Sequence, residues 1–185
     1  MYFDVFISGF GGQGILLAGQ LLAEAAMEKG LNVTFFPSYG VEMRGGTARC
    51  TVVISDEEIG SPVVDSPGCV ISMNQPSLRR FQGVVAEGGL LIVNSSLAKM
   101  EDVTREGIQV HEVPMSDLAI ELGNTRLTNM VALGAYAQLS GAIKPEELAK
   151  ALQSVIPARN QKFIPMNEKA ILKGAEYATG GMDIQ

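Results

Sequence analysis

Two glycine-bearing segments contain the residues of this chain whose types and spacing could do chemistry. The first, Gly9-Phe10-Gly11-Gly12-Gln13-Gly14, fits the G-x-G-x-x-G spacing and stands between an apolar run and a helical pattern. Glycines let the backbone approach a ligand closely, and free N–H groups at the start of a helix favour an anion. This segment therefore predicts a backbone loop that contacts an anion or a partner chain. The alternative is a structural turn that packs the helix on its sheet.

The second segment is Ser38-Tyr39-Gly40-Val41-Glu42-Met43-Arg44-Gly45-Gly46. Arg44 is its only permanently cationic side chain, and a guanidinium can donate two parallel hydrogen bonds to a carboxylate or phosphate. Gly45 and Gly46 remove side chains beside it, and Glu42 could orient it. The segment follows a predicted strand end, where ligands of open α/β sheets bind. It predicts an anion contact, with a surface arginine paired to a local glutamate as the alternative.

A dinucleotide-binding turn also needs an acidic residue at the end of the second strand, to hold the ribose hydroxyls. In this chain the strand ends in Phe35-Phe36-Pro37-Ser38, which contains no acid. The sequence therefore disfavours NAD or FAD as the ligand of the first segment.

Other residues offer weaker candidates. Asn74 follows a predicted strand directly, so it is either a ligand contact or a turn former and helix cap. His111 and Glu112 are neighbours in a strand, where successive side chains face opposite ways, so they predict no catalytic pair. Cys50 and Cys69 form no Cys-x-x-Cys motif, and the sequence offers no metal-ligand set of its own. Both are expected to be reduced and buried.

Alternating strand and helix patterns organise the chain. Strands are expected at 2–7, 32–36, 47–55, 69–73, 90–94 and 109–113, with a short returning edge strand at Val63-Val64. Helices are expected at 14–29, 76–81, 115–122, 128–139, 145–155 and 167–178. The pattern predicts a single three-layer α/β domain over residues 1–185, with a mostly parallel, doubly wound sheet, an antiparallel extension and C-terminal helices. Residues 179–185 are expected to form a mobile tail.

Composition narrows the class of function. The chain has 185 residues, 46% of them hydrophobic, which is enough for one substantial core. Its net charge of −6 disfavours a nucleic-acid surface, and no apolar stretch is long enough to span a membrane. Because strand-like residues begin the sequence in place of a charged leader, we expect a cytoplasmic protein.

Taken together, the two glycine segments and the Val52–Ile54 strand with its Ser55-Asp56-Glu57 turn resemble the gamma subunits of the 2-oxoacid:ferredoxin oxidoreductases. This family includes the 2-oxoglutarate, 2-oxoisovalerate and pyruvate synthases. The resemblance covers most of the chain, including the Ser72-Met73-Asn74-Gln75 strand end and the terminal helices.

The resemblance implies a subunit of an enzyme that decarboxylates a 2-oxoacid oxidatively, forming acyl-CoA, CO2 and reduced ferredoxin, with 2-oxoglutarate favoured as substrate. Coenzyme A would be the co-substrate. Thiamine diphosphate, magnesium and iron–sulfur clusters would sit on partner subunits, because this sequence holds no motif for them. The implied partners are thiamine-binding alpha and beta subunits, a ferredoxin-like delta subunit, and ferredoxin as the acceptor. The isolated chain is expected to be inactive.

The resemblance also implies that the segment around Arg44 approaches the substrate region, so Arg44 is expected to contact a substrate carboxylate or the phosphates of coenzyme A. Three alternatives stay open on the sequence. They are the beta subunit of an indolepyruvate oxidoreductase, a stand-alone nucleotide-binding module, and a scaffold without a catalytic role.

Overall fold

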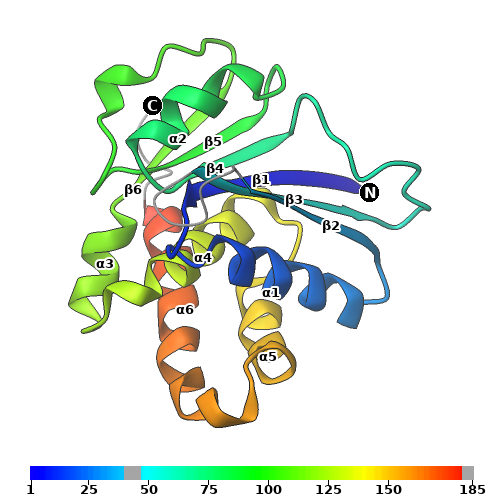
Figure 1. Cartoon of the computed structure of the whole chain (residues 1–185), viewed down its shortest axis with the longest axis vertical. Coiled ribbons are helices and arrows are strands. Elements are labelled where there is room, and N and C mark those ends of the chain that lie inside the picture. The colour runs from blue at the N-terminus through cyan, green and yellow to red at the C-terminus, as the bar shows by residue number, and fades with distance from the viewer. Residues whose placement is uncertain (40–46, 181–185) are drawn as a thin grey trace.

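The protein folds around one mixed β-sheet, with helices on both faces (Figure 1). The structure is a computed structural model that describes residues 1–39 and 47–180. The strands are β1 (Tyr2–Phe10), β2 (Asn32–Tyr39), β3 (Thr47–Ser55), β4 (Cys69–Ser72), β5 (Leu90–Asn94) and β6 (Gln109–Val113). The helices are α1 (Ile15–Glu28), α2 (Gln75–Phe81), α3 (Met115–Glu121), α4 (Thr128–Ser140), α5 (Pro145–Val155) and α6 (Ile164–Gly180).

The six strands lie in the order β2-β3-β1-β4-β5-β6. Strands β1, β4, β5 and β6 pair in parallel, whereas β3 is antiparallel to both β1 and β2. The predicted βαβ unit therefore has its two strands parallel but separated by β3. The antiparallel extension lies inside the sheet, and the predicted α/β class with a mostly parallel sheet is confirmed.

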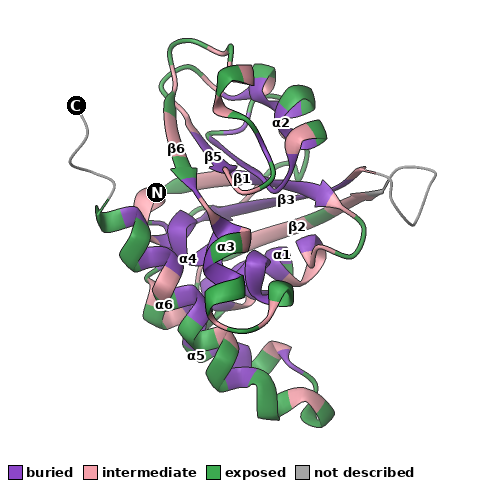
Figure 2. Cartoon of the chain, turned by 90° about the vertical axis from the view of Figure 1, so that its left-hand side faces the viewer, coloured by how far each residue is buried: buried purple, intermediate pink, exposed green. Residues whose placement is uncertain are grey.

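Alternate residues along the central strands enter two separate cores, as the period of two in a strand requires. Val5 and Ile7 of β1 pack into the larger core with α1, α4, α5 and α6. Phe6, between them, enters the smaller core with Leu78 and Phe81 of α2. Figures 1 and 2 show the resulting layers, with buried residues concentrated in the sheet and on the inner sides of the helices.

Glycine sets the closest helix contact in the larger core. Helix α4 crosses α6 so closely that a Cβ at Gly134 would collide with the carbonyl oxygen of Ile171. In return, a Cβ at Gly174 of α6 would collide with the carbonyl oxygen of Val131. Gly134 and Gly174 therefore let α4 and α6 pack with their backbones in contact.

Two sequence expectations need revision. The predicted edge strand at Val63-Val64 is wrong, because residues 56–68 contain no strand and Val63 is exposed. Two valines between turn residues offer too short a run to hold a ladder against solvent. At the C-terminus, Thr179 and Gly180 belong to α6, although we expected the mobile tail to begin there; residues 181–185 lie outside the described residues.

Candidate functional site

The connections that follow the neighbouring strands β1 and β4 run to opposite faces of the sheet, and this defines a crevice at the carboxyl edge of the sheet. From β1 the chain continues through α1 on one face to β2, whereas from β4 it continues through α2 on the other face to β5. Two neighbouring parallel strands whose connections diverge form a topological switch point, where open α/β sheets bind ligands. The turns that follow these two strands therefore form the candidate site.

The turn after β1 is built from the predicted glycine segment. Gly12 and Gly14 have φ values of 100° and 73°, in the left-handed region that glycine adopts without strain. Gly14 is the N-cap residue of α1, and Gly11 and Gly12 are exposed. Within residues 1–39 and 47–180, no acceptor binds the N–H groups of Gly11, Gly12 or Gly14. The turn thus presents donors to solvent beside the positive end of a helix.

Gln13 joins this turn to the turn after β4. Its Oε1 accepts hydrogen bonds from the Phe10 N–H at 2.7 Å and from Nδ2 of Asn74 at 2.8 Å. The Asn74 Oδ1 accepts in turn from the Ser77 N–H at 3.0 Å, which caps α2. Asn74 is only 4% exposed. The sequence left Asn74 as either a ligand contact or a cap; in the structure it is a cap that also fixes Gln13.

Gly9 lies at the end of β1, directly beneath this bridge. A Cβ at Gly9 would lie 2.6 Å from Gln13 Oε1 and 2.8 Å from Cδ1 of Ile15. Three glycines of the segment therefore have different roles: Gly9 leaves room for Gln13, Gly12 provides the turn, and Gly14 begins the helix. Gly9 and Gly14 belong to the predicted G-x-G-x-x-G spacing, whereas Gly12 does not. Both alternatives for the segment have support, because it packs α1 on the sheet and also leaves donors exposed.

Asn129 of α4 supports the turn from below, and sequence patterns did not identify it. Its Nδ2 donates to the Gly14 carbonyl oxygen at 3.1 Å, across 115 positions of sequence. Asn129 is 3% exposed, and its Oδ1 is buried without a partner among the described residues. A buried amide oxygen without a donor is uncommon in proteins. Asn129 therefore holds the glycine turn through Nδ2, while the burial of its Oδ1 lowers the stability of the fold.

A third asparagine extends the polar network along the same edge. Asn94, at the end of β5, is fully buried and donates through Nδ2 to the Met73 carbonyl oxygen at 3.1 Å and to Ser116 Oγ at 3.0 Å. Its Oδ1 accepts from the Ser116 N–H. Polar residues thus stand at the ends of two adjacent strands. The sequence signal that could have identified Asn94 as a site residue is its position directly after an apolar run.

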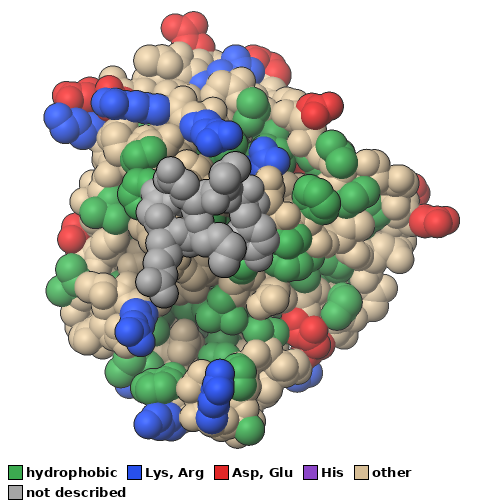
Figure 3. Space-filling model, in the orientation of Figure 1, with side chains coloured by type: hydrophobic (Ala, Val, Ile, Leu, Met, Phe, Trp, Pro, Cys, Tyr) green, Lys and Arg blue, Asp and Glu red, His purple; other side chains and the backbone are tan. Residues whose placement is uncertain are grey.

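The described cation nearest to this edge in the sheet register is Arg49 of β3. It pairs with Ser8 of β1 on one side and with Ser38 of β2 on the other. Its guanidinium lies 4.4 Å from the centroid of the Phe6 ring and 5.5 Å from that of Phe81. Burial, and then the charge of Arg80, lower the pKa of Arg49. Lys and Arg side chains gather with acidic ones at the α2 end of the molecule in Figure 3.

The second predicted segment falls mostly outside the described residues. Glu42, Arg44, Gly45 and Gly46 all lie in residues 40–46, so their predicted role stays a prediction. The strands on both sides of this segment are described, and they pair up to Tyr39 and Ala48. Ser38 and Tyr39 end β2, and Ser38 is partly exposed beside Arg49.

The two cysteines are poor ligands for a metal cluster. Burial raises the pKa of Cys50 to about 12 and raises that of Cys69 as well, so both thiols stay protonated at neutral pH. They are free and lie on different strands. In the described part of the chain, no group of three His, Cys, Asp or Glu side chains could hold a metal ion. No helix there has the length and hydropathy to cross a membrane.

Comparison with known proteins adds to this geometry. Residues 4–177 match the family model described as pyruvate ferredoxin/flavodoxin oxidoreductase. The chain is 39% identical to ketoisovalerate oxidoreductase subunit VorA of Methanothermobacter thermautotrophicus over 94% of its own length. It spans only 36% of that relative, so it corresponds to about a third of the longer protein.

Two solved structures have the same fold. The gamma subunit of a keto/oxoacid ferredoxin oxidoreductase from Geobacter sulfurreducens superimposes with a TM-score of 0.83 and 30% identity, covering 96% of this chain and 99% of that one. The 2-oxoglutarate:ferredoxin oxidoreductase of Magnetococcus marinus, with 2-oxoglutarate, coenzyme A and succinyl-CoA bound, gives a TM-score of 0.87 and 25% identity. This match covers 97% of this chain and 31% of the other.

The fold defines an open α/β domain, and the turns after β1 and β4 lie at its topological switch point. The family match, which covers most of the chain, makes the assignment specific: the chain belongs to the pyruvate ferredoxin/flavodoxin oxidoreductase family. The resemblance to gamma subunits inferred from the two glycine segments is confirmed, and with it the membership of an enzyme family.

Proposed function

We propose that this chain is the gamma subunit of a multi-subunit 2-oxoacid:ferredoxin oxidoreductase. The complex would convert a 2-oxoacid and coenzyme A into acyl-CoA and CO2 and pass the electrons to ferredoxin. Relatives are named for ketoisovalerate and 2-oxoglutarate, and we favour 2-oxoglutarate. The chain spans about a third of those longer relatives, so the rest of the machinery would lie outside these 185 residues.

Partner subunits would supply the cofactors. The protonated, separated thiols of Cys50 and Cys69 do not suit an iron–sulfur cluster, which needs several thiolates around one site. We therefore place thiamine diphosphate and magnesium on alpha and beta subunits, and the clusters on a ferredoxin-like delta subunit. The cytoplasm is the compartment that fits such a complex.

The switch-point turn would contact an anionic group at the junction with these partners. The observation that carries this proposal is the Gln13–Asn74 hydrogen bond, which fixes the turn while the N–H groups of Gly11 and Gly12 remain exposed. Backbone donors held in place and aimed outward suit the phosphates of coenzyme A or the carboxylate of the 2-oxoacid. Arg44 would add the charge, and Glu42 would orient it.

A charge placed in the turn tests the proposal in the reconstituted complex. In Gln13→Glu, the carboxylate can still accept from the Phe10 and Asn74 donors, so the turn keeps its hydrogen bonds while gaining a negative charge. We expect the KM for coenzyme A or for the 2-oxoacid to rise about ten-fold, as like charges at close range disfavour an anion. Gln20→Glu, the same change at an exposed position of α1, is the matched control.

Arg44→Ala should raise the same KM. If neither Gln13→Glu nor Arg44→Ala changes the KM for coenzyme A or for the 2-oxoacid, this contact does not exist and a scaffold role is favoured. Turnover of the complex on 2-oxoglutarate, ketoisovalerate, pyruvate and indolepyruvate identifies the substrate, and fastest turnover of indolepyruvate would support the indolepyruvate alternative. Tight binding of NAD, FAD or ATP to the isolated chain in calorimetry would support the nucleotide-binding alternative.

A further inference from the structure

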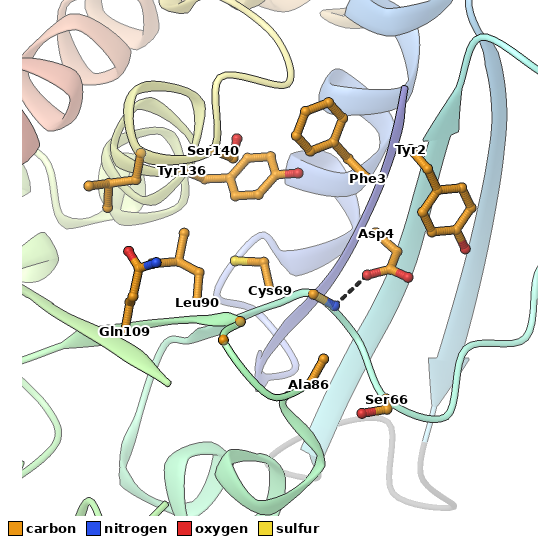
Figure 4. A pocket seen from close by; sticks show the side chains of 14 residues that line it. Tyr2, Phe3, Asp4, Ser66, Cys69, Ala86, Leu90, Gln109, Tyr136 and Ser140 are labelled. Atoms are coloured by element: carbon orange, nitrogen blue, oxygen red, sulfur yellow. Dashed lines mark hydrogen bonds between the residues drawn. The ribbon is translucent and has the colours of Figure 1, made fainter. Parts of the chain in front are cut away.

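A second cavity opens at the opposite edge of the sheet, away from the crevice between β1 and β4. It has a volume of about 420 Å³ and lies among the amino ends of β1, β4, β5 and β6 and the last turn of α4 (Figure 4). This volume is within the range of small-molecule sites. Phe3, Leu90 and Leu139 provide apolar lining. No residue of the first glycine segment lines this cavity, and the proposed function gives the cavity no role.

Asp4 provides the charge of the cavity. Its Oδ1 accepts a hydrogen bond from the Gly68 N–H at 2.5 Å, so the carboxylate is held by the segment that leads into β4. The exposed Tyr2 hydroxyl also hydrogen-bonds to this carboxylate. A carboxylate has about four acceptor sites, so Asp4 can still accept a hydrogen bond from a ligand. Among the residues that the structure describes, the cavity lining contains no lysine, arginine or histidine. An anion such as a 2-oxoacid or a phosphate would meet the negative charge of Asp4, whereas a cation would find a fixed counter-charge.

Tyr136 adds a buried polar group. The residue is 1% exposed, and Figure 4 shows its side chain beside Phe3 and Ser140 in the cavity wall. A buried tyrosine hydroxyl normally has a partner, and the Ser140 side chain provides one here. The two hydroxyls together give this wall of the cavity polar groups that can also contact a ligand. Burial is the main cause that raises the pKa of Tyr136, so it remains a neutral phenol that can both donate and accept.

We propose that this cavity binds a primary ammonium group carried on an apolar stem. The ammonium would donate to the Asp4 carboxylate and to the hydroxyl oxygens of Tyr136 and Ser140, and the stem would lie against Phe3 and Leu139. Three donors on one cation match a carboxylate and two hydroxyls, and the apolar wall excludes water around them.

Tyrosine fluorescence of the full chain measures this binding directly. The chain has no tryptophan and four tyrosines, of which Tyr2 and Tyr136 line the cavity. Benzylammonium is the probe, and benzyl alcohol and benzoate carry the same ring with no charge and with a negative charge. We expect saturable binding of benzylammonium at least about ten-fold tighter than that of either control. Equal binding of all three compounds, or no saturable change, would overturn the proposal.

Two variants locate the binding. Asp4→Asn keeps an acceptor for the Gly68 N–H and removes only the charge, so it should fold and bind benzylammonium about ten-fold more weakly. Tyr136→Phe should also weaken binding. Asp56→Asn, at an exposed aspartate that pairs with the N-terminal amine, should bind like the wild type. Unchanged affinity in Asp4→Asn would contradict the proposal whatever the other variants show.

The ammonium could belong to a free amine or to a lysine of a partner chain. If the assembled complex binds benzylammonium as the isolated chain does, the natural ligand is a small molecule. If assembly blocks the probe and Asp4→Asn weakens assembly, the ligand is a lysine side chain. Blocked access with assembly unaffected by Asp4→Asn would contradict a role for the cavity in the complex. None of these measurements uses turnover, so their failure is distinct from failure of the proposed function.

Discussion

Nδ2 of Asn74 donates a 2.8 Å hydrogen bond to Oε1 of Gln13, and this contact joins the turns that follow two neighbouring parallel strands. Each residue also bonds to backbone at its own turn: Gln13 accepts from Phe10 and Asn74 from Ser77. Movement of one turn would therefore break a bond at the other. The exposed glycine backbone between them is held by side chains that need not touch the ligand themselves.

Two substitutions of Asn74 distinguish the contributions of its two hydrogen bonds to stability. Asn74→Ala should lower the free energy of unfolding by about 2 kcal/mol, because it removes the cap of α2 and the bond to Gln13. Asn74→Asp keeps the cap but cannot donate to Gln13 Oε1, so about half of this loss is expected. Urea unfolding measures both. Asn124→Ala, which removes one exposed cap bond to the Arg126 N–H, is the control for a cap alone. Equal losses in both Asn74 variants would contradict a role for the bridge.

Because α4 and α6 are in close contact, one added methyl group between them should lower stability strongly. Gly134→Ala places a Cβ against the Ile171 carbonyl oxygen, which belongs to a helix backbone and cannot move aside cheaply. We expect a loss of about 1–3 kcal/mol in the free energy of unfolding. Gly83→Ala has open space around its Cβ and should change stability by no more than about 0.5 kcal/mol. Similar midpoints for the two variants in thermal unfolding would refute the close contact.

Substitutions in the glycine turn should rank by what the new Cβ meets. Gly12→Ala has no atom within 4 Å of the new Cβ, so only its φ of 100° is unfavourable, at a cost of about 1–2 kcal/mol. Gly14→Ala adds a collision with the Asn129 side chain to a φ of 73° and should cost more. Calorimetric unfolding of the two variants checks the order. The reverse order would show that Asn129 moves aside freely.

Cysteine reactivity should report unfolding. Burial raises the pKa of the Cys50 thiol to about 12, and Cys69 is raised as well, so neither forms appreciable thiolate at pH 8 in the folded chain. Because the thiolate is the reactive species, labelling by a disulfide reagent should be slow in buffer and fast in urea. Raising the pH from 7 to 9 should change native labelling little. A Ser61→Cys variant, at an exposed position, provides the fast native control. Rapid labelling of the native wild type would contradict this burial.

The sequence predicted most elements of the fold because its local signals are strong. Ile15 and Leu22 recur at helical spacing in α1 and are buried as the spacing requires, and Gly30 ends that helix with a φ of 76°. The order in which the strands pair was harder to predict from the sequence. The segment from Thr47 to Ser55 shows its strand character locally, but its insertion between β1 and β2 depends on packing among residues far apart in sequence.

For the candidate site, the sequence identified the turn but not its supports. Gly9 to Gly14 could be located because spacing and position agree with a backbone turn. Asn129 could not, because it lies 115 positions from Gly14 in a helix that otherwise shows only packing residues. Arg49 was also missed: a lone arginine in a strand carries no motif, and its place over Phe6 becomes visible only when the strands are aligned.

The insertion of β3 beside β2 has an evolutionary consequence. Tyr39 of β2 pairs with Ala48 of β3, so the strands on both sides of residues 40–46 are held in the sheet. Because the β2–β3 register is set by these described strands, a change in the number of residues between Tyr39 and Ala48 need not shift the pairing of the two strands. Homologues can therefore differ in this connection in length and in sequence while they keep the same sheet.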